Sequence, residues 1–139
     1  MSAEKLPMIV IDAAHTAVGR LASHAAKQAL LGKTVAVINC EKAIVTGGKA
    51  NILSRYKEMR AKGGSSQRGP YFPTKPAAIV KRTIRGMLSH KEGRGHAAFD
   101  RVRCYEGVPQ SLANTTAISH AAGEHTKALS MAEISKELR

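Results

Sequence analysis

The first third of the chain contains two continuous apolar runs, and between them a segment whose apolar residues recur with the period of a helix. Continuous apolar runs at residues 8–11 and 35–38 are rich in β-branched side chains and predict strands covered on both faces. Between them, the apolar positions of residues 18–30 follow the helical period, with Thr16 placed to cap that helix and Gly32 to end it. A strand, a helix and a strand in this order predict a βαβ unit with parallel strands, and hence an α/β fold.

The next segment predicts a short strand, a helix and a loop. The strand is expected at residues 43–45, and the turn Thr46-Gly47-Gly48-Lys49 leads into a helix that runs to about residue 62. Residues 63–73 contain several Gly, Ser and Pro residues, which is typical of a loop.

Lys75 and Pro76 predict the start of another helix with one apolar stripe and one basic face. Its inward positions are expected to be Ile79, Val80, Ile84, Met87 and Leu88. Its outward positions are expected to be Lys81, Arg82 and Arg85.

Two glycines and an alternating segment follow this helix. Gly93 and Gly95 flank Arg94 and predict an irregular basic turn over residues 91–95. Polar and apolar residues alternate over residues 101–105, which predicts a strand with one exposed face or edge.

The remaining residues predict a loose segment and a short helix. Residues 107–128 contain few large apolar side chains and are expected to form an arm or a loosely packed loop. Ser130 and Glu133 have the spacing of a capping box, and Leu129 and Ile134 that of a hydrophobic staple, so a helix is predicted to begin here.

Positive charge is concentrated in the middle of the chain. The 139 residues carry a net charge of +12, and residues 42–103 account for all of it with fifteen Lys and Arg against three acids. A basic segment between neutral flanks indicates a surface that binds a polyanion. No stretch approaches the roughly 20 apolar residues that a membrane span needs, so no membrane partner is expected.

The residues that usually bind metals or nucleotides lack the required spacing. Cys40 and Cys104 are far apart and form no C-x-x-C, so each is expected to pack as a small apolar residue without a disulfide or zinc ion. The six histidines have no metal-ligand spacing either. Gly32-Lys33-Thr34 lacks the first glycine of a P-loop, so no cofactor is expected.

Asp12 and Glu41 follow the first two predicted strands and leave two interpretations. Both carboxylates could meet at the carboxyl edge of a parallel sheet, where α/β enzymes place their sites. The favoured alternative is that they hold turns, because no nucleophile or cofactor loop accompanies them. The chain is therefore not expected to be an enzyme or to have a small-molecule substrate.

The basic segment offers several candidate phosphate contacts. The turn before Lys49 could present backbone N–H groups to a phosphate or could be a plain glycine turn. Tyr71 and Phe72 could stack on unpaired bases or anchor their loop to the core. The residues predicted to bind the nucleic acid are Lys49, Arg55, Arg60, Lys62, Arg68, Tyr71, Lys75, Lys81, Arg82, Arg85, His90, Lys91 and Arg94.

Four stretches of the chain resemble one protein family in order and spacing. Residues 37–47 (VINCEKAIVTG) and 81–88 (KRTIRGML) resemble the two signature stretches of the family of the thirteenth protein of the large ribosomal subunit. Residues 10–22 and 102–107 look like that family's amino-terminal stretch and last strand. Arg68-Gly69-Pro70-Tyr71 is similar to the archaeal and eukaryotic branch.

This resemblance implies a three-layer α/β/α fold with a small, mainly parallel sheet. It covers about residues 8–109, so an α/β RNA-binding domain is expected at residues 1–109, and a C-terminal arm with a short helix at residues 110–139. It implies a structural, non-enzymatic role in the cytoplasmic ribosome, with large-subunit ribosomal RNA and neighbouring ribosomal proteins as partners and no cofactor. The alternative from charge alone is a free-standing nucleic-acid-binding protein, because the electrostatics are the same for any polyanion.

Overall fold

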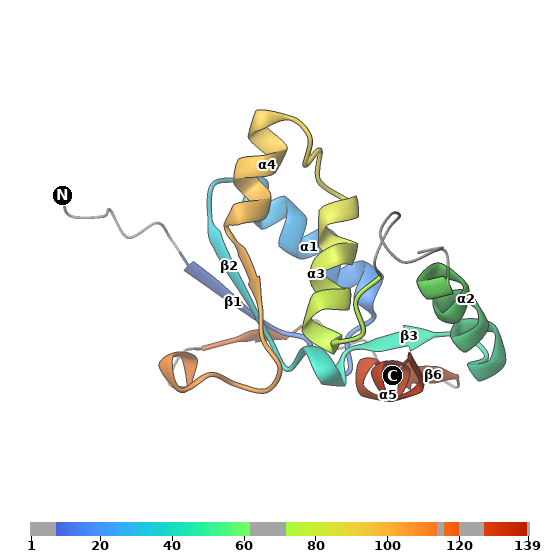
Figure 1. Cartoon of the computed structure of the whole chain (residues 1–139). Coiled ribbons are helices and arrows are strands. Elements are labelled where there is room, and N and C mark those ends of the chain that lie inside the picture. Colours follow the sequence, from blue (N-terminus) through green and yellow to red (C-terminus); the bar gives the residue numbers. More distant parts are fainter. Residues whose placement is uncertain (1–7, 62–71, 114–115, 120–126, 139) are drawn as a thin grey trace.

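Four parallel strands form the main sheet of the protein, in the order β4-β2-β1-β5 (Figure 1). The computed structural model describes residues 8–61, 72–113, 116–119 and 127–138. The strands are β1 (Met8–Asp12), β2 (Thr34–Ile38), β4 (Val102–Cys104) and β5 (Ile118–Ser119). The central strand β2 is buried on both faces, which agrees with its continuous apolar sequence.

Helices cover one face of this sheet, and a short segment covers the other. The helices are α1 (Val18–Leu30), α3 (Pro76–Gly86) and α4 (Gly93–Asp100), and α1 packs against both of the others. Their apolar stripes meet the strand residues Ile11, Val35 and Val37 in one core. On the opposite face, Leu112 of the 3₁₀-helix η2 (Gln110–Leu112) packs in a second, smaller cluster. The predicted α/β class with a small, mainly parallel sheet is confirmed.

A second sheet joins two segments that are distant in the sequence. The 3₁₀-helix η1 (Cys40–Lys42) leads to β3 (Ile44–Thr46), which pairs antiparallel with β6 (Ala128–Ser130). Two helices, α2 (Lys49–Ala61) and α5 (Met131–Leu138), follow these strands and pack against each other. Met131 and Ile134 of α5 are fully buried in the same core as α1 and α3. A domain boundary after residue 109 stays a prediction.

The start of α1 differs from the prediction. Ala17 is the N-cap residue and its methyl group cannot accept a hydrogen bond, so the first turn has no side-chain cap. The Thr16 hydroxyl is buried and donates to the carbonyl of Ala14 at 3.3 Å. The backbone carbonyl of Thr16 accepts from the N–H of Ile44 at 3.0 Å. The predicted Thr16 cap is therefore wrong, because this residue joins α1 to β3 instead.

The segment around Gly93 is helical, which the sequence pattern did not predict. Helix α4 begins at Gly93 and contains Gly95, which is buried. A Cβ atom at Gly95 would lie 2.0 Å from the backbone oxygen of Ser89. The second glycine therefore allows two backbone segments to approach closely and does not form a turn.

The prediction that Met87 faces inward from α3 is also wrong. Met87 follows the end of that helix and is 44% exposed.

Ser130 caps α5 as predicted, since its hydroxyl accepts a hydrogen bond from the N–H of Glu133 at 3.3 Å. Ser130→Ala is expected to lower the free energy of unfolding by about 1 kcal/mol, because that N–H loses its partner. Urea denaturation measures the change. Ser54→Ala, on the exposed face of α2, is the matched control and should not destabilise. Equal losses in both variants would show that the cap does not contribute.

Candidate nucleic-acid interface

Asp12 and Glu41 are both engaged in holding turns. One oxygen of Asp12 accepts hydrogen bonds from the N–H of Ala14 at 2.9 Å and from the side-chain amide of Asn39 at 3.1 Å. Glu41 accepts from the N–H of Gly107 at 2.8 Å. The interpretation of these carboxylates as turn-holding groups is confirmed. Among the residues that the structure describes, no three His, Cys, Asp or Glu side chains gather in a way that could hold a metal ion.

Phe72 is an anchor for the end of the loop that precedes α3. Its ring lies 5.7 Å from that of Tyr56, and the Arg82 guanidinium lies 5.3 Å from the Phe72 ring centre. Its backbone carbonyl accepts a hydrogen bond from the Arg60 guanidinium at 2.9 Å. Phe72 is buried, so the anchoring interpretation is confirmed for this residue. Arg60 and Arg82, which were both predicted to bind RNA, therefore also hold Phe72 in place within the protein.

Three cations surround a cavity of about 320 Å³ between the first turns of α3 and the strand β4. Lys75 is the N-cap residue of α3, Lys81 lies in the middle of that helix, and Arg103 lies on β4. Ala77, Ala78, Cys104 and Tyr105 complete the lining, which contains no acidic residue. We call this the α3–β4 cavity. The amino end of a helix carries partial positive charge, so the backbone and the side chains both favour an anion here.

Lys81 is held in place within the α3–β4 cavity by an aromatic ring. Its ammonium lies 5.0 Å from the centre of the Phe99 ring, from α4, in a cation–π contact. The side chain is half-buried, so its charge is only partly hydrated. A positioned cation loses less conformational entropy when it binds a phosphate than a freely rotating one does.

A larger cavity of about 630 Å³ lies on the other side of α3, between α1, β3 and α2. We call it the α1–α2 cavity. Arg20 of α1 and Arg55 of α2 line it, together with Thr83 and Tyr56. Burial raises the pKa of the Tyr56 phenol, which therefore stays protonated, and a hydrogen-bond donor, to a higher pH than an exposed tyrosine does. This cavity also contains no acidic lining residue.

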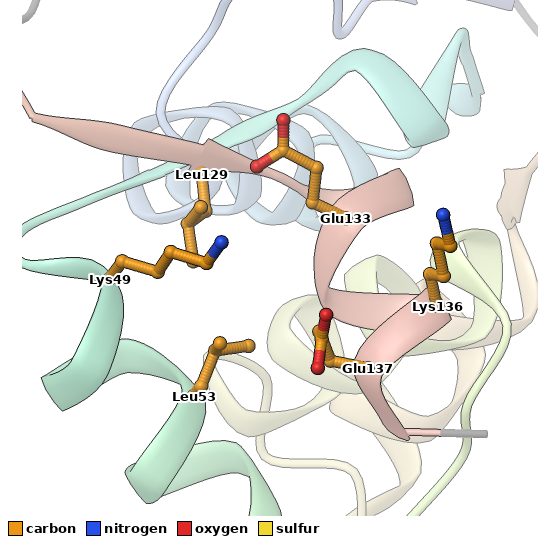
Figure 2. Close-up of a pocket in the computed structure, with 6 residues that line it drawn as sticks. All are labelled: Lys49, Leu53, Leu129, Glu133, Lys136 and Glu137. Carbon is orange, nitrogen blue, oxygen red and sulfur yellow. The ribbon is translucent and has the colours of Figure 1, made fainter.

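Lys49 occupies a different environment from these cations. It lines a pocket of about 200 Å³ between α2 and α5, together with Glu133 and Glu137 (Figure 2). The N–H of Gly47, in the turn before it, donates to the carbonyl of Lys127 at 3.0 Å. This amide is therefore already paired, which favours the glycine-turn interpretation over a phosphate seat.

The other predicted RNA-binding residues are spread over a wider surface. Arg85 and His90 are half-buried near the end of α3, and Lys91 and Arg94 are exposed around the start of α4. Lys62, Arg68 and Tyr71 lie outside the residues that the structure describes.

Sequence reasoning left out two cations that line the cavities, Arg20 and Arg103. The alternation over residues 101–105 places Arg103 on the exposed side of its strand, and Arg20 lies on the polar face of its helix. These two patterns could have identified Arg103 and Arg20 as exposed cations. Neither pattern shows which other cations lie nearby, because that depends on tertiary packing.

Residues 7–111 match the sequence pattern of the family described as ribosomal protein L13. The chain belongs to this family. Large ribosomal subunit protein uL13 of Methanosarcina barkeri is 42% identical to it over 137 residues, which cover 94% of this chain and 97% of that protein. The uL13 protein of Archaeoglobus fulgidus is also 42% identical, over 93% of this chain and 86% of its own length.

A third relative has a higher identity over a shorter part of the chain. The uL13 protein of Haloarcula marismortui is 48% identical over 101 residues, which cover 73% of this chain and 68% of that protein. These relatives are archaeal, in agreement with the branch that the sequence resembles. All residues that line the α3–β4 and α1–α2 cavities lie within the L13 match, whereas Glu133 and Glu137 beside Lys49 do not.

Within the part of the chain that the structure describes, no helix of this L13 protein has the length and apolar character needed to cross a membrane.

Proposed function

We propose that this protein is a structural constituent of the large ribosomal subunit, where it binds ribosomal RNA and supports RNA folding without catalysing a reaction. The observation that carries the proposal is the α3–β4 cavity, because Lys75, Lys81 and Arg103 surround it with no acid among the lining residues. Its relatives are named as proteins of the large ribosomal subunit. Large-subunit ribosomal RNA and neighbouring ribosomal proteins are therefore its proposed partners.

Phosphate neutralisation is the physical basis of the proposed binding. Each Lys or Arg that contacts a phosphate releases condensed counterions, so binding weakens steeply as salt rises. The α3–β4 and α1–α2 cavities both include residues of α3 in their lining, and the fold sets the positions from which their cations extend. Such an arrangement selects an RNA by the positions of its phosphates, and thus by its tertiary shape more than by base sequence.

The proposal of a non-enzymatic role is supported by the state of the candidate catalytic groups. Asp12 and Glu41 accept hydrogen bonds from backbone or amide N–H groups within turns, which leaves them structurally engaged. A free-standing nucleic-acid-binding protein is the competing proposal, because the same cations would neutralise any polyanion. Sedimentation of a cell lysate after DNase treatment separates the two: the ribosomal role requires co-migration with large subunits.

Replacing Lys75, Lys81 and Arg103 together by glutamine is the direct test of the interface. The affinity for protein-free large-subunit ribosomal RNA is expected to fall on the order of 100-fold at moderate salt. The slope of log K against log salt should become shallower by about 0.7 to 0.9 per lost phosphate contact. Filter binding across a salt series measures both quantities, and circular dichroism checks that the fold persists.

The matched control replaces Lys27, Lys127 and Lys136 by glutamine. These lysines are exposed, none of them is among the predicted RNA-binding residues, and none lines the α3–β4 or the α1–α2 cavity. The control removes the same net charge, so it accounts for the general electrostatic attraction. Equal losses of affinity and slope in both triple variants would contradict the assignment of the α3–β4 cavity as the contact.

A further inference from the structure

The two cysteines, which are far apart in the sequence, lie next to each other in the fold. Cys104 pairs with Val37 in the parallel register of β4 and β2. The Cys40 thiol donates to the carbonyl of Val37 at 3.6 Å, and the N–H of Cys40 donates to the carbonyl of Tyr105 at 3.1 Å. Cys40 is therefore held against the backbone of residues 104 and 105. Both cysteines are free thiols.

The two cysteines are neighbours across the pairing of β2 with β4, because Cys104 pairs with Val37 and the Cys40 thiol lies on the carbonyl of Val37. Interaction with the neighbouring Cys104 thiol is the main cause, and burial the second cause, of the raised pKa of the Cys40 thiol. Cys40 thus keeps its proton at neutral pH. Its side chain is completely buried, so a reagent in solution does not reach it in the folded protein.

Cys104 has a more accessible environment than Cys40. It is half-buried and lines the α3–β4 cavity with Lys75, Lys81 and Arg103. The thiolate form of a cysteine is its reactive nucleophile. A thiol that is accessible, lies in an electropositive site and has a second thiol beside it has the arrangement of a redox-responsive cysteine.

We propose that Cys104 and Cys40 form a reversible disulfide when a hydroperoxide enters the α3–β4 cavity. Cys104 is the sulfur oxidised first, and Cys40 is the resolving thiol. This site of oxidative modification is independent of the proposed RNA-binding role, because it requires only the cavity, its cations and the adjacent thiol.

The reaction proceeds in two balanced steps. In the first, the Cys104 thiol gives up its proton, its sulfur attacks one oxygen of the hydroperoxide, and the O–O bond breaks to leave a sulfenic acid. The departing alkoxide or hydroxide takes up the proton that Cys104 lost and leaves as an alcohol or water. In the second, the Cys40 sulfur attacks the Cys104 sulfur, the S–O bond breaks, and the departing hydroxide takes the Cys40 proton to form water. Two thiols are oxidised and one hydroperoxide is reduced; a small dithiol reverses the change.

The neighbouring thiol makes the second step fast relative to competing reactions. The two cysteines are already neighbours in the fold, so no diffusional encounter is needed. Without a resolving thiol, the sulfenic acid would remain open to a second hydroperoxide and would become an irreversible sulfinic acid. Cys40 therefore determines whether oxidation of Cys104 is reversible.

Hydrogen peroxide added to the reduced, full-length protein is the test. Mass spectrometry of the intact chain is expected to show the loss of two hydrogens per monomer, and thiol titration the loss of both thiols together. Peptide mapping should link the peptides of Cys40 and Cys104, and dithiothreitol should restore the starting mass. This measurement needs no variant, so it decides the proposal whether or not a cysteine substitution changes folding.

Two variants and one control test the order of events. In Cys40→Ala, the chain is expected to gain oxygen atoms at Cys104 instead of losing hydrogens. In Cys104→Ala, the loss of the Cys40 thiol should be at least about tenfold slower than in the unchanged protein, because the remaining thiol is buried. Lys81→Gln should slow the oxidation of Cys104, whereas Lys136→Gln should not.

Three results would overturn the proposal. The first is a gain of oxygen by the unchanged protein without a loss of hydrogens. The second is a disulfide found only between two chains. The third is an unchanged rate of Cys40 oxidation in Cys104→Ala, which would show that Cys40 reacts on its own.

Discussion

Replacing Gly95 with alanine is expected to destabilise the protein by about 3 kcal/mol or more, since overpacking against backbone exceeds the cost of overpacking against side chains. The added Cβ would lie 2.0 Å from the carbonyl oxygen, 2.3 Å from the carbonyl carbon and 2.9 Å from the Cα of Ser89. Backbone atoms cannot rotate out of the way as a flexible side chain can. Either α4 or the segment before it must move. Chemical denaturation followed by circular dichroism measures the loss.

Gly93→Ala is the matched control because it lies in the same helix, two residues earlier. No atom lies within 4 Å of the Cβ that this substitution would add. Alanine also has the higher helix propensity, so Gly93→Ala is expected to be neutral or slightly stabilising. If both variants lost the same stability, the close approach of α4 to Ser89 would not be the reason for glycine at position 95.

Met131→Ala is expected to lower the free energy of unfolding by about 2 to 5 kcal/mol. Met131 is fully buried at the start of α5, and its N–H donates to the carbonyl of Ala43 at 2.8 Å. The substitution leaves a cavity in the core that α5 shares with α1 and α3. Urea denaturation should therefore show one cooperative transition at a lower midpoint, rather than the loss of a separate C-terminal step.

Met87→Ala makes the same chemical change at an exposed position. Its side chain is 44% exposed at the end of α3, so the expected loss is below about 1 kcal/mol. A small loss in Met131→Ala, similar to that in Met87→Ala, would contradict the view that α5 belongs to the main core. Residues 110–139 would then behave as the independent arm that the sequence suggests.

Periodicity in the sequence predicted most of the main elements. The helices at residues 18–30 and 49–61 agree closely with the structure because each has one buried face, and the strand after Gly32 does so because its continuous apolar run is buried on both faces. Helix α4 was missed because glycine usually interrupts a helix, whereas Gly95 is required by its contact with Ser89. The need for glycine at position 95 comes from the packing of two segments against each other, so it produces no recognisable pattern in the local sequence.

The candidate site could be predicted only in part, for the same reason. The charge count identified the basic segment, and the periodicity of α3 identified Lys81 as one of its cations. The grouping of Lys81 with Arg103 depends on where β4 joins the sheet. The proximity of Cys40 and Cys104 depends on the same strand pairing. Because the two cysteines are far apart in the sequence, the sequence suggested that each packs separately.

The pairing of β3 with β6 affects how this chain can fold during its own synthesis. Strand β3 is made about 80 residues before its partner, and a chain grows at roughly 5 to 20 residues per second. Ile44–Thr46 and the helix after it therefore wait on the order of 4 to 16 seconds before β6 and α5 can cover them. Strands β1 and β2 and helix α1 are complete much earlier. Completion of the core is thus timed by translation of residues 128–138, and a chain stalled before them would expose apolar surface to chaperones.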